Sequence, residues 1–572
     1  MIYRFFKRRK IGRANPFVEP DEVFLDDRNL PVFDKQQFEG RIEKTIGKKA
    51  IWLVFGFASL LFLFFTIRLG VLQIKQGKEL QELSLINALE KQPVFAERGI
   101  IFDRNNIPLA WNDKPDTTED TMFYKRVYIA SGGFGNLLGY VQYPKKDSSG
   151  NYWRTEFTAT DGIEEAFNED LQGENGEWIF EEDVQGNIVS SNVINPPLHG
   201  KNISLSIDKD LQENMYKEIV KMATEVGYQG GAGIVMDVKT GELLTMTTFP
   251  QYDPNVLSLG TDTKTISGYN TSSRKPFLNR AIAGLYSPGS IIKPFVGLSA
   301  LIEGVVTETT QILSDSYISI PNPYDSTKKT LFRDLHPNNG WVDIKKALAV
   351  SSNIYFYEVG GGYQGQKGIG IEKLKNRIKE FGIAQKTGIE IAGEKDGTIP
   401  DPRWKEENFP DDPWRIGDTY NTSIGQYGFQ VTPIEMVRAV ASIANKGTVL
   451  RPTIIKKSGK DKGEVQATLP HKTEHFDAIH EGMRLAVTES YGTVQRLNIL
   501  SFDVAAKTGT AQVGANNEYI NSWIIGFWPY ENPRYAFTIL LERGPGSINV
   551  GASSVAQGFL LWLEKNKPEY IQ

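Results

Sequence analysis

The feature that most constrains this 572-residue chain is an uncharged apolar run from Ala50 to Ile67. At about 18 residues, the run has the length that one helix needs to span the hydrocarbon core of a bilayer. A cleaved signal peptide is the alternative, but residues 1–49 precede the run and contain no obvious small-residue cleavage site. We therefore expect residues 50–69 to form a single transmembrane helix.

Basic residues flank this run unequally. Those upstream include Arg4, Lys7, Arg8, Arg9, Lys10, Arg13, Lys44, Lys48 and Lys49, whereas the nearest ones downstream are Arg68, Lys75 and Lys78. By the positive-inside rule, the N-terminus is cytoplasmic and the chain from about Gly70 onward lies outside the cytoplasm. The expected location is the cytoplasmic (inner) membrane. Because no ATP is available on the outer side, we expect an energy-neutral group transfer there.

Size and composition exclude several classes of function. A chain of this length is expected to hold two or three folded units, which excludes an isolated small binding module. The formal net charge of −5 gives no reason to expect a nucleic-acid partner. The absence of cysteine removes disulfides, thiolate metal ligands and a cysteine nucleophile.

Sequence patterns divide the chain into four parts. Residues 1–49 show no sustained periodicity of apolar residues and are expected to form an unfolded cytoplasmic tail ahead of the helix at 50–69. Apolar residues then keep a helical spacing to about residue 95. Candidate strands follow at 99–102, 123–130 and 178–180. We therefore expect a mainly β pedestal over 70–199.

The remaining part, residues 200–572, begins after a cluster of turn residues at 196–200. Strands and helices then alternate unevenly up to a C-terminal helix at 553–566. This order predicts an α+β domain in which helices pack on an antiparallel sheet.

A serine followed three residues later by a lysine is the first element of a candidate active site. A serine hydroxyl needs an adjacent base, which a lysine one helical turn later can supply. Ser290 is favoured because a turn precedes it and an apolar helix follows, whose dipole favours an oxyanion and which places Lys293 on the same face. The alternative is a helix N-cap serine with a solvent-reaching lysine. Four copies of the pattern start at Ser206, Ser272, Ser290 and Ser326.

The second element is Ser-x-Asn, which occurs at Ser190, Ser351 and Ser547. Ser351 lies between two helix-like segments that would present it to a cleft. Its hydroxyl is suited to relay a proton, and Asn353 to hold an amide. The alternative for Ser351 is again a helix N-cap.

The third element is Lys-Thr-Gly, which occurs at Lys239, Lys386 and Lys507. The copy at Lys239 joins two strands as a hairpin turn, and the copy at Lys386 lies in a loop without a matching strand. The copy at Lys507 continues a strand of small residues, along which a substrate backbone can add as a further strand. Lys507 offers a cation for a carboxylate. The alternative is an exposed lysine on a solvated edge strand.

Taken in order, Ser290-x-x-Lys293, Ser351-x-Asn353 and Lys507-Thr508-Gly509-Thr510 resemble the motifs of the penicilloyl serine transferases. Upstream, Arg98 to Asn105 resembles the segment that opens the extracytoplasmic part of class B high-molecular-mass penicillin-binding proteins. Gly162-Ile-Glu164 resembles their next pedestal motif. The segments at 417–420 and 426–428 look most like the penicillin-binding protein 2 group of elongation enzymes, with a division-type class B enzyme as the alternative.

The resemblance implies a serine β-lactamase-like fold and a peptidoglycan D,D-transpeptidase that cross-links stem peptides during cell-wall elongation. In that mechanism Ser290 attacks the penultimate D-Ala carbonyl of a stem pentapeptide and Lys293 accepts its proton. The amine of a second stem then resolves the acyl-enzyme. β-Lactams are expected to acylate Ser290, because they imitate D-Ala-D-Ala.

The resemblance also implies roles for the other motif residues. Ser351 and Lys507 would shuttle the leaving-group proton, and Asn353 would hold the peptide amide. The strand at Thr508, Gly509 and Thr510 would bind the substrate, with the two threonines on its terminal carboxylate. The oxyanion hole would consist of the backbone N–H groups of Ser290 and Thr510.

The chain departs from the family pattern at two places. Asn106 stands where the pedestal motif often has glycine, but asparagine also tolerates left-handed backbone. Some elongation enzymes carry a metal site with a cysteine, and here only Asp334 and His336 are suggestive. We therefore predict no metal and no cofactor.

Three other functions are compatible with parts of the pattern. A D,D-carboxypeptidase or β-lactamase-like hydrolase shares the three motifs but needs neither a membrane helix nor a pedestal. A penicillin-sensing receptor needs a larger cytoplasmic domain than residues 1–49. A scaffold that activates a SEDS-family glycosyltransferase is compatible with catalysis, and we expect both roles.

The pedestal segment contains Arg98, Asp103 and Arg104 close together. One interpretation is a local surface salt bridge that contributes about 0 to 1 kcal/mol. We favour the other, in which these side chains make directional contacts with the glycosyltransferase.

Overall fold

The computed structural model describes residues 47–80, 89–114, 122–182, 188–322, 325, 327–335, 337–459, 461–514, 516–546 and 550–571. The chain forms two compact units, Met1–Leu89 and Glu90–Gln572. Most of the expected tail over 1–49 lies outside the described residues.

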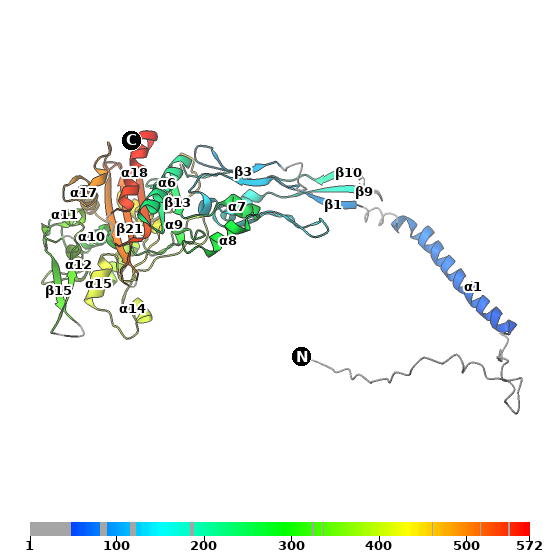
Figure 1. Cartoon of the computed structure of the whole chain (residues 1–572), viewed down its shortest axis with the longest axis horizontal. Coiled ribbons are helices and arrows are strands. Elements are labelled where there is room, and N and C mark those ends of the chain that lie inside the picture. The colour runs from blue at the N-terminus through cyan, green and yellow to red at the C-terminus, as the bar shows by residue number, and fades with distance from the viewer. Residues whose placement is uncertain are drawn as a thin grey trace, which may run out of the picture. The chain divides into compact units, whose positions relative to one another are not determined.

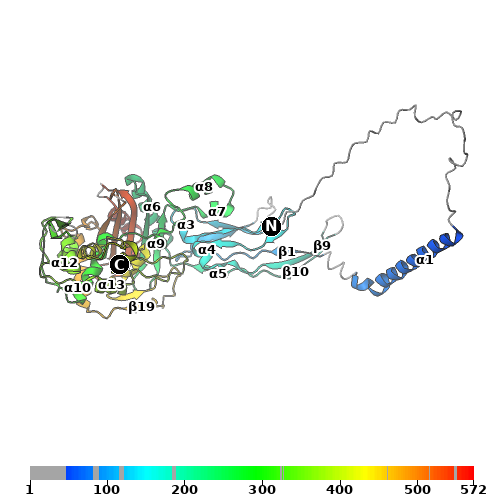
Figure 2. The ribbon, with the colours of Figure 1, turned by 90° about the horizontal axis from the view of Figure 1, so that it is seen from below.

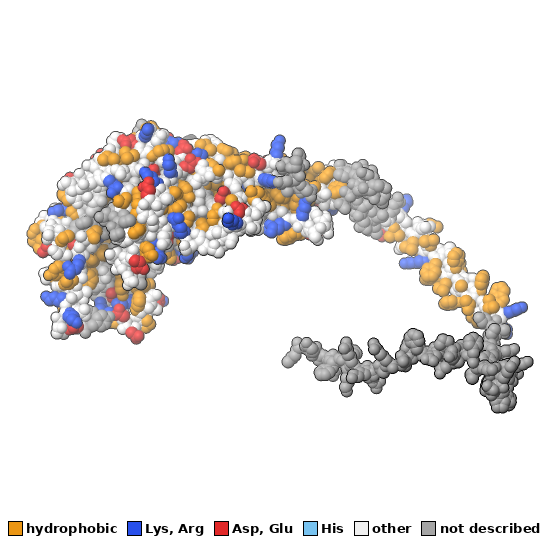
Figure 3. All heavy atoms as spheres, in the orientation of Figure 1, with side chains coloured by type: hydrophobic (Ala, Val, Ile, Leu, Met, Phe, Trp, Pro, Cys, Tyr) orange, Lys and Arg blue, Asp and Glu red, His pale blue; other side chains and the backbone are white. Residues whose placement is uncertain are grey.

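The first unit contains helix α1 (Lys48–Gly70), which continues through a π-helical turn, η3 (Val71–Lys75). No residue of α1 is buried, and Figure 3 shows hydrophobic side chains along its surface. By length and composition this helix can cross a membrane, and it is the only such helix among the described residues. The helical pattern expected to reach residue 95 ends earlier. Leu89–Val94 instead forms strand β1, which pairs with a later strand and is tied to it by a Lys91–Glu177 ion pair.

The chain from β1 to about residue 204 is rich in short strands, as predicted. Its sheets have the orders β1-β9-β10, β11-β2-β3-β4, β5-β8 and β6-β7. The remaining strands are β2 (Ile101–Phe102), β3 (Pro108–Asp113), β4 (Lys125–Tyr128), β5 (Tyr140–Gln142), β6 (Lys145–Lys146), β7 (Tyr152–Arg154), β8 (Thr158–Thr160), β9 (Gly176–Glu182), β10 (Ile188–Asn195) and β11 (Ile203–Ser204). The short helices are α3 (Gly135–Leu138), α4 (Gly162–Ala166) and α5 (Asn168–Gln172).

A buried ionic triad holds this β-rich part together. Glu164 accepts from Arg98 Nε at 2.5 Å and from Arg126 Nε at 2.7 Å, and all three side chains are at most 1% exposed. Burial raises the pKa of Glu164, but the two guanidinium groups more than offset it and the pKa is lowered. Arg98 is therefore not a surface residue, and the expectation that it contacts a partner is wrong.

Asp103 is also buried and joins the β-rich part to the rest of the unit. Its carboxylate accepts from the backbone N–H groups of Asn105, Ile107 and Lys209. A partner contact for Asp103 is therefore excluded as well. Asn106 has a φ of 64°, which confirms that it adopts the left-handed backbone expected of it. Strand β11 pairs in parallel with β2 and continues the chain into the larger part.

The larger part is built on a five-stranded antiparallel sheet with the order β13-β12-β22-β21-β20. Its strands are β12 (Gly230–Asp237), β13 (Leu243–Phe249), β20 (Ala505–Val513), β21 (Tyr519–Trp528) and β22 (Tyr535–Pro545). Strands β20, β21 and β22 form a meander, and β20 is an edge strand. Two-stranded antiparallel sheets consist of β14 (Ile312–Ser314) with β17 (Gly340–Val342), β15 (Tyr317–Pro321) with β16 (Lys329–Arg333), and β18 (Thr448–Leu450) with β19 (Val465–Thr468).

Helices cover both faces of this sheet, which confirms the predicted α+β class (Figure 1). They are α6 (Lys209–Val226), α7 (Pro254–Leu259), α8 (Thr263–Thr271), α9 (Arg280–Ala283), α10 (Lys293–Ile302), α11 (Ile344–Ala349), α12 (Asn353–Gly361), α13 (Ile371–Glu380), α14 (Pro402–Asn408), α15 (Ile416–Ser423), α16 (Pro433–Ala444), α17 (Thr473–Thr488) and α18 (Ala552–Asn566). Short 3-10 turns are η4 (Gly289–Ile292), η5 (Gln495–Leu497) and η6 (Pro568–Tyr570).

Alternation along the strands divides the core into two layers. Val235, Ile524 and Ile539 pack with α6 and α18, whereas their neighbours Ile234, Ile525 and Leu540 pack with α16 and α10. Helix α7 packs on β4 and β5 of the β-rich part (Figure 2). The edge strand β20 is left beside η4 and α17, where a binding site can open.

Replacement of the buried acid tests the triad. Glu164→Gln leaves two buried guanidinium groups without a compensating charge, so the free energy of unfolding should fall by about 3 to 5 kcal/mol. Urea denaturation of the full chain, followed by tryptophan fluorescence, measures the change. Asp170→Asn is the control, because its ion pair with Lys201 is exposed, and it should leave stability unchanged. Equal stability of the Glu164 variant and the control would contradict this account.

Candidate active site

Ser290 lies in a tight turn that leads into a buried helix. The turn is η4, and α10 starts at Lys293, so the predicted helix is present but its first turn is 3-10. Pro294 lies in the first turn of α10, where backbone N–H groups lack intrahelical acceptors. Ser290 is half-buried, whereas Gly289 and Ile291 beside it are buried.

Two glycines allow this turn to approach strand β20 closely. Gly289 has a φ of 57°, and a Cβ there would lie 2.7 Å from the carbonyl oxygen of Thr510. A Cβ on Gly509 would lie 2.9 Å from the backbone nitrogen of Ile291. The backbone N–H of Gly289 also donates to Gly425 O at 3.0 Å, at the end of α15. Backbone contacts on both sides therefore fix the position of Ser290.

Lys293 is completely buried beside this turn. Its Nζ donates to Ser351 O at 2.7 Å and to Asn353 Oδ1 at 2.7 Å, and lies 3.4 Å from Ser351 Oγ. Burial lowers the pKa of Lys293 to about 7, although the negative charge of Asp334 opposes the shift. At neutral pH a large fraction of this amine is therefore unprotonated and able to accept a proton.

Ser351 occupies the junction of α11 and α12, as expected from the two helix-like segments. Its φ of 59° is unusual for a residue other than glycine. The N-cap of α12 is Ser352, which accepts from Tyr355 N at 3.1 Å, so the interpretation of Ser351 as the cap is wrong. Asn353 donates from Nδ2 to Arg333 O at 3.3 Å while Oδ1 accepts from Lys293. The side-chain oxygen of Asn353 is thus engaged by Lys293, and its predicted contact with the substrate amide stays a prediction.

Lys507 extends from the edge strand β20 toward the same serine. It is 0% exposed, which excludes the interpretation as a solvated edge lysine. Its Nζ donates to Ser351 Oγ at 2.8 Å and to Thr508 O at 2.8 Å. Burial, and then the nearby charge of Lys293, lower the pKa of Lys507 well below its usual value. Two lysine amines from different elements therefore converge on one hydroxyl.

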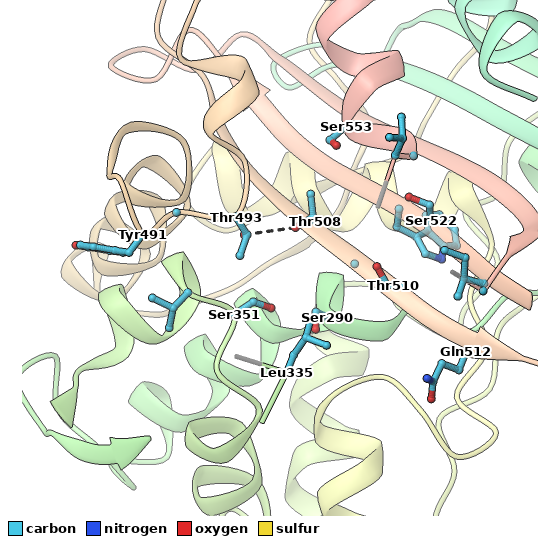
Figure 4. Close-up of a pocket in the computed structure, with 18 of the residues that line it drawn as sticks. Ser290, Leu335, Ser351, Tyr491, Thr493, Thr508, Thr510, Gln512, Ser522 and Ser553 are labelled. Atoms are coloured by element: carbon cyan, nitrogen blue, oxygen red, sulfur yellow. Dashed lines mark hydrogen bonds between the residues drawn. The ribbon is translucent and has the colours of Figure 1, made fainter. Parts of the chain in front are cut away.

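A cavity of about 650 Å³ lies over these groups. Ser290 and Ser351 lie beneath strand β20, along which Thr508, Thr510 and Gln512 are displayed (Figure 4). Thr508 Oγ1 also donates to Thr493 Oγ1 at 3.4 Å. None of the described residues that line the cavity carries a formal charge, so both lysines act from below its wall. The lining also includes Tyr228, Leu335, Asn339, Val350, Tyr491, Gly492, Gly509, Ile520, Ser522, Trp523, Gly546, Val550, Gly551 and Ser553.

The other copies of the three motifs lie elsewhere. Ser206 is buried and donates to the carbonyls of Leu243 and Thr453, and Ser272 ends helix α8. Lys239 lies in the predicted hairpin turn between β12 and β13, and Lys386 lies in a loop. Ser190 belongs to strand β10. The copies at Ser326 and Ser547 fall outside the described residues.

Asp334 was not assigned to the site by any sequence motif. Its carboxylate contacts the Ser351 turn through hydrogen bonds from Ser352 Oγ and Asn353 N. The sequence suggested it only as a metal ligand together with His336, which lies outside the described residues. Among the residues that the structure describes, no group of three or more His, Cys, Asp or Glu side chains is arranged to hold a metal ion.

Comparisons with known proteins identify similar chains. The model of the penicillin-binding protein transpeptidase domain matches residues 231–559, and that of the penicillin-binding protein dimerisation domain matches residues 121–205. The peptidoglycan D,D-transpeptidase MrdA of Haemophilus influenzae is 30% identical over 478 residues, which cover 78% of this chain and 70% of the relative.

Solved structures of PBP2 proteins are also similar to this chain. PBP2 of Pseudomonas aeruginosa, in complex with WCK 5153, is 29% identical with a TM-score of 0.69, and the match covers 84% of this chain and 100% of that one. PBP2 of Helicobacter pylori, in complex with MreC, is 26% identical with a TM-score of 0.68, covering 84% and 99%.

The lowered pKa of Lys293 predicts a specific pH dependence. In the predicted mechanism Lys293 accepts the proton of Ser290, which only its unprotonated amine can do, so the second-order rate of acylation by a penicillin should rise through about pH 7 and then level off. Stopped-flow labelling with a fluorescent penicillin between pH 5.5 and 9 measures the profile. Lys293→Arg should abolish labelling at every pH, whereas Lys239→Arg should keep the wild-type profile. A rate that is independent of pH across this range would contradict the assignment of Lys293 as the base.

Proposed function

Because this chain belongs to the penicillin-binding protein transpeptidase family and is a peptidoglycan D,D-transpeptidase, we propose that Ser290 is its acylated residue. The observation that carries the proposal is the convergence of Lys293 and Lys507 on Ser351 Oγ, next to Ser290 in one cavity. No other described copy of the motifs has such neighbours.

Acylation uses Lys293 as the base. Ser290 Oγ attacks the penultimate D-Ala carbonyl of a donor stem peptide and loses its proton to Lys293 Nζ. The bond between the two D-Ala residues breaks, an ester forms on Ser290, and the leaving amine receives a proton from Ser351 Oγ. The proton that Lys293 accepted then replaces the one that Ser351 gave up, through a relay in which Lys293 Nζ lies 3.4 Å and Lys507 Nζ 2.8 Å from Ser351 Oγ. Asn353 keeps Lys293 oriented throughout.

Deacylation reverses these proton transfers with a different nucleophile. The amine of an acceptor stem attacks the ester carbonyl and gives up a proton, and Ser290 Oγ recovers one as it leaves. The backbone N–H groups of Ser290 and Thr510 are proposed to stabilise the oxyanion in both steps. The products are a cross-linked peptide and free enzyme, with no net change in oxidation state and no cofactor.

The strand Thr508, Gly509 and Thr510 is proposed to bind the donor peptide. The exposed side of an edge strand allows a substrate backbone to add to the sheet. Thr508 and Thr510 both line the cavity, so their hydroxyls are placed to receive the terminal carboxylate. β-Lactams would occupy the same position, because they imitate D-Ala-D-Ala.

The position in the cell follows from the apolar helix. We assign the chain to the cytoplasmic membrane as a single-pass protein with a cytoplasmic N-terminus, supported by helix α1 and by the basic residues upstream of it. Protease protection in oriented membrane vesicles tests the orientation, and a C-terminal domain on the cytoplasmic side would contradict it.

We divide the rest of the chain into a pedestal, 70–199, and a transpeptidase domain, 200–572, and we assign the enzyme to cell-wall elongation.

We assign the pedestal a docking role toward a SEDS-family glycosyltransferase. The support is that a similar PBP2 was solved with a protein partner, MreC, and that the pedestal displays Trp153 at 64% exposure. Trp153→Ala should lower glycan polymerisation by the reconstituted pair without changing penicillin acylation. Trp341→Ala, equally exposed at 60% but in β17, is the matched control. Normal polymerisation by the Trp153 variant would contradict this role.

Replacement of Ser290 tests the assignment of the nucleophile. Ser290→Ala should abolish covalent penicillin labelling without a change in melting temperature, because it removes only a hydroxyl. Ser206→Ala and Ser272→Ala are matched controls that carry the same Ser-x-x-Lys pattern and should label normally. Mass spectrometry of the labelled peptide gives an independent check, and a label outside the peptide that contains Ser290 would overturn the proposal.

A further inference from the structure

A carboxylate outside the three motifs contacts the turn that carries Ser351. Asp334 follows strand β16, and its Oδ1 accepts from Asn353 N at 2.9 Å and from Leu335 N at 2.8 Å. Its Oδ2 accepts from Ser314 Oγ at 2.7 Å and from Ser352 Oγ at 3.0 Å. Four hydrogen bonds therefore converge on one carboxylate.

The two serines in this cluster have no exposure to solvent. Ser314 and Ser352 are both 0% exposed, and their hydroxyl oxygens lie 2.8 Å apart. Asn339 Nδ2 also donates to Ser314 Oγ at 3.3 Å. Within the described part of the chain, Asp334 forms no ion pair, so its charge is compensated by hydroxyl and backbone dipoles. Buried hydroxyl networks of this kind rigidify the backbone that they join.

The turn needs such support because its backbone is strained. Ser351 has a φ of 59°, and a left-handed non-glycine residue persists only where the surrounding structure fixes it. Asp334 holds the next two residues, Ser352 and Asn353, from behind. On the other side, Lys293 holds Ser351 O and Asn353 Oδ1.

From this arrangement we propose that Asp334 is a positioning residue for the transpeptidase reaction, which fixes the Ser351–Asn353 turn against Lys293 through the Ser314–Ser352 hydroxyl cluster. It does not touch the cavity that we assign to substrate. The inference rests on the proposed roles of Ser290 and Lys293. It adds residues at the ends of β14 and β16 to a site otherwise assembled from η4, α10, the α11–α12 junction and β20.

The charge of Asp334 also acts on Lys293. Among the residues that the structure describes, two charged groups face Lys293: Asp334 from the loop after β16, whose negative charge raises the pKa, and Lys507 from β20, whose positive charge would disfavour a second cation nearby. Loss of the Asp334 charge should therefore lower the pKa of Lys293 from about 7 to a smaller value. A change that only weakened the fold, without altering a charge near Lys293, would not shift this titration.

The test is the acylation profile of Asp334→Asn in the full chain. The amide keeps an oxygen for Asn353 N but cannot accept from both hydroxyls. We expect the plateau rate of penicillin acylation to fall about tenfold. The midpoint of its pH dependence should move to lower pH. Peptide mapping of the label in this variant shows whether Ser290 is still the residue modified, which separates failure of this inference from failure of the proposed function.

Two matched variants separate positioning from stability. Ser314→Ala removes one donor from the cluster but no charge, so it should lower the plateau rate at least threefold and leave the midpoint unchanged. Asp343→Asn removes a carboxylate that caps the N-terminus of α11, where it accepts from Lys346 N at 2.9 Å. It should change neither the plateau rate of acylation nor the midpoint of its pH dependence at a temperature where the protein stays folded. A wild-type rate in Ser314→Ala, or an unshifted midpoint in Asp334→Asn, would overturn the inference. If Asp334→Asn does not fold, Ser314→Ala alone decides.

Discussion

Two lysine amines share the hydroxyl of Ser351, at 3.4 Å from Lys293 Nζ and 2.8 Å from Lys507 Nζ, and neither side chain reaches solvent. Two ammonium groups so placed would repel each other in a medium that solvates them poorly, so both pKa values are lowered. The lowered pKa of Lys293 suits it to the proposed role of base at neutral pH. The conformation of Ser351, the orientation of Asn353 and the contacts of Asp334 all keep these groups together.

The fold supplies this convergence from segments far apart in sequence. The five-stranded sheet places Lys507 on an edge strand, and glycines at 289 and 509 let that strand approach the Ser290 turn. Helices α11 and α12 bring their junction, which contains Ser351, to the same point. The pedestal is held separately by the Glu164 triad, whose charges are satisfied internally. Changes in that triad should therefore affect the stability of the pedestal more than the chemistry at Ser290.

Much of this organisation could be predicted from the sequence. The apolar helix, the β-rich pedestal, the small-residue strand that carries Lys507 and the junction of two helices at Ser351 depend on local patterns, which a sequence displays. Burial of Lys507 and of Arg98 could not be predicted, because it depends on which distant elements cover them. The role of Asp334 was missed for the same reason: its partners, Ser314 and Ser352, are separated from it by 20 and 18 positions along the chain.

The most direct test of the account is the protonation of the two lysines. Nuclear magnetic resonance of the full chain, labelled with ¹³C at lysine Cε, follows each side chain between pH 5 and 11, and Lys293→Arg and Lys507→Arg assign the two resonances. Two lysines should titrate well below the usual value of 10.5, with Lys293 near 7. Titration of every lysine near 10.5 would contradict it, because two charged amines would then share one buried hydroxyl and neither could serve as a base.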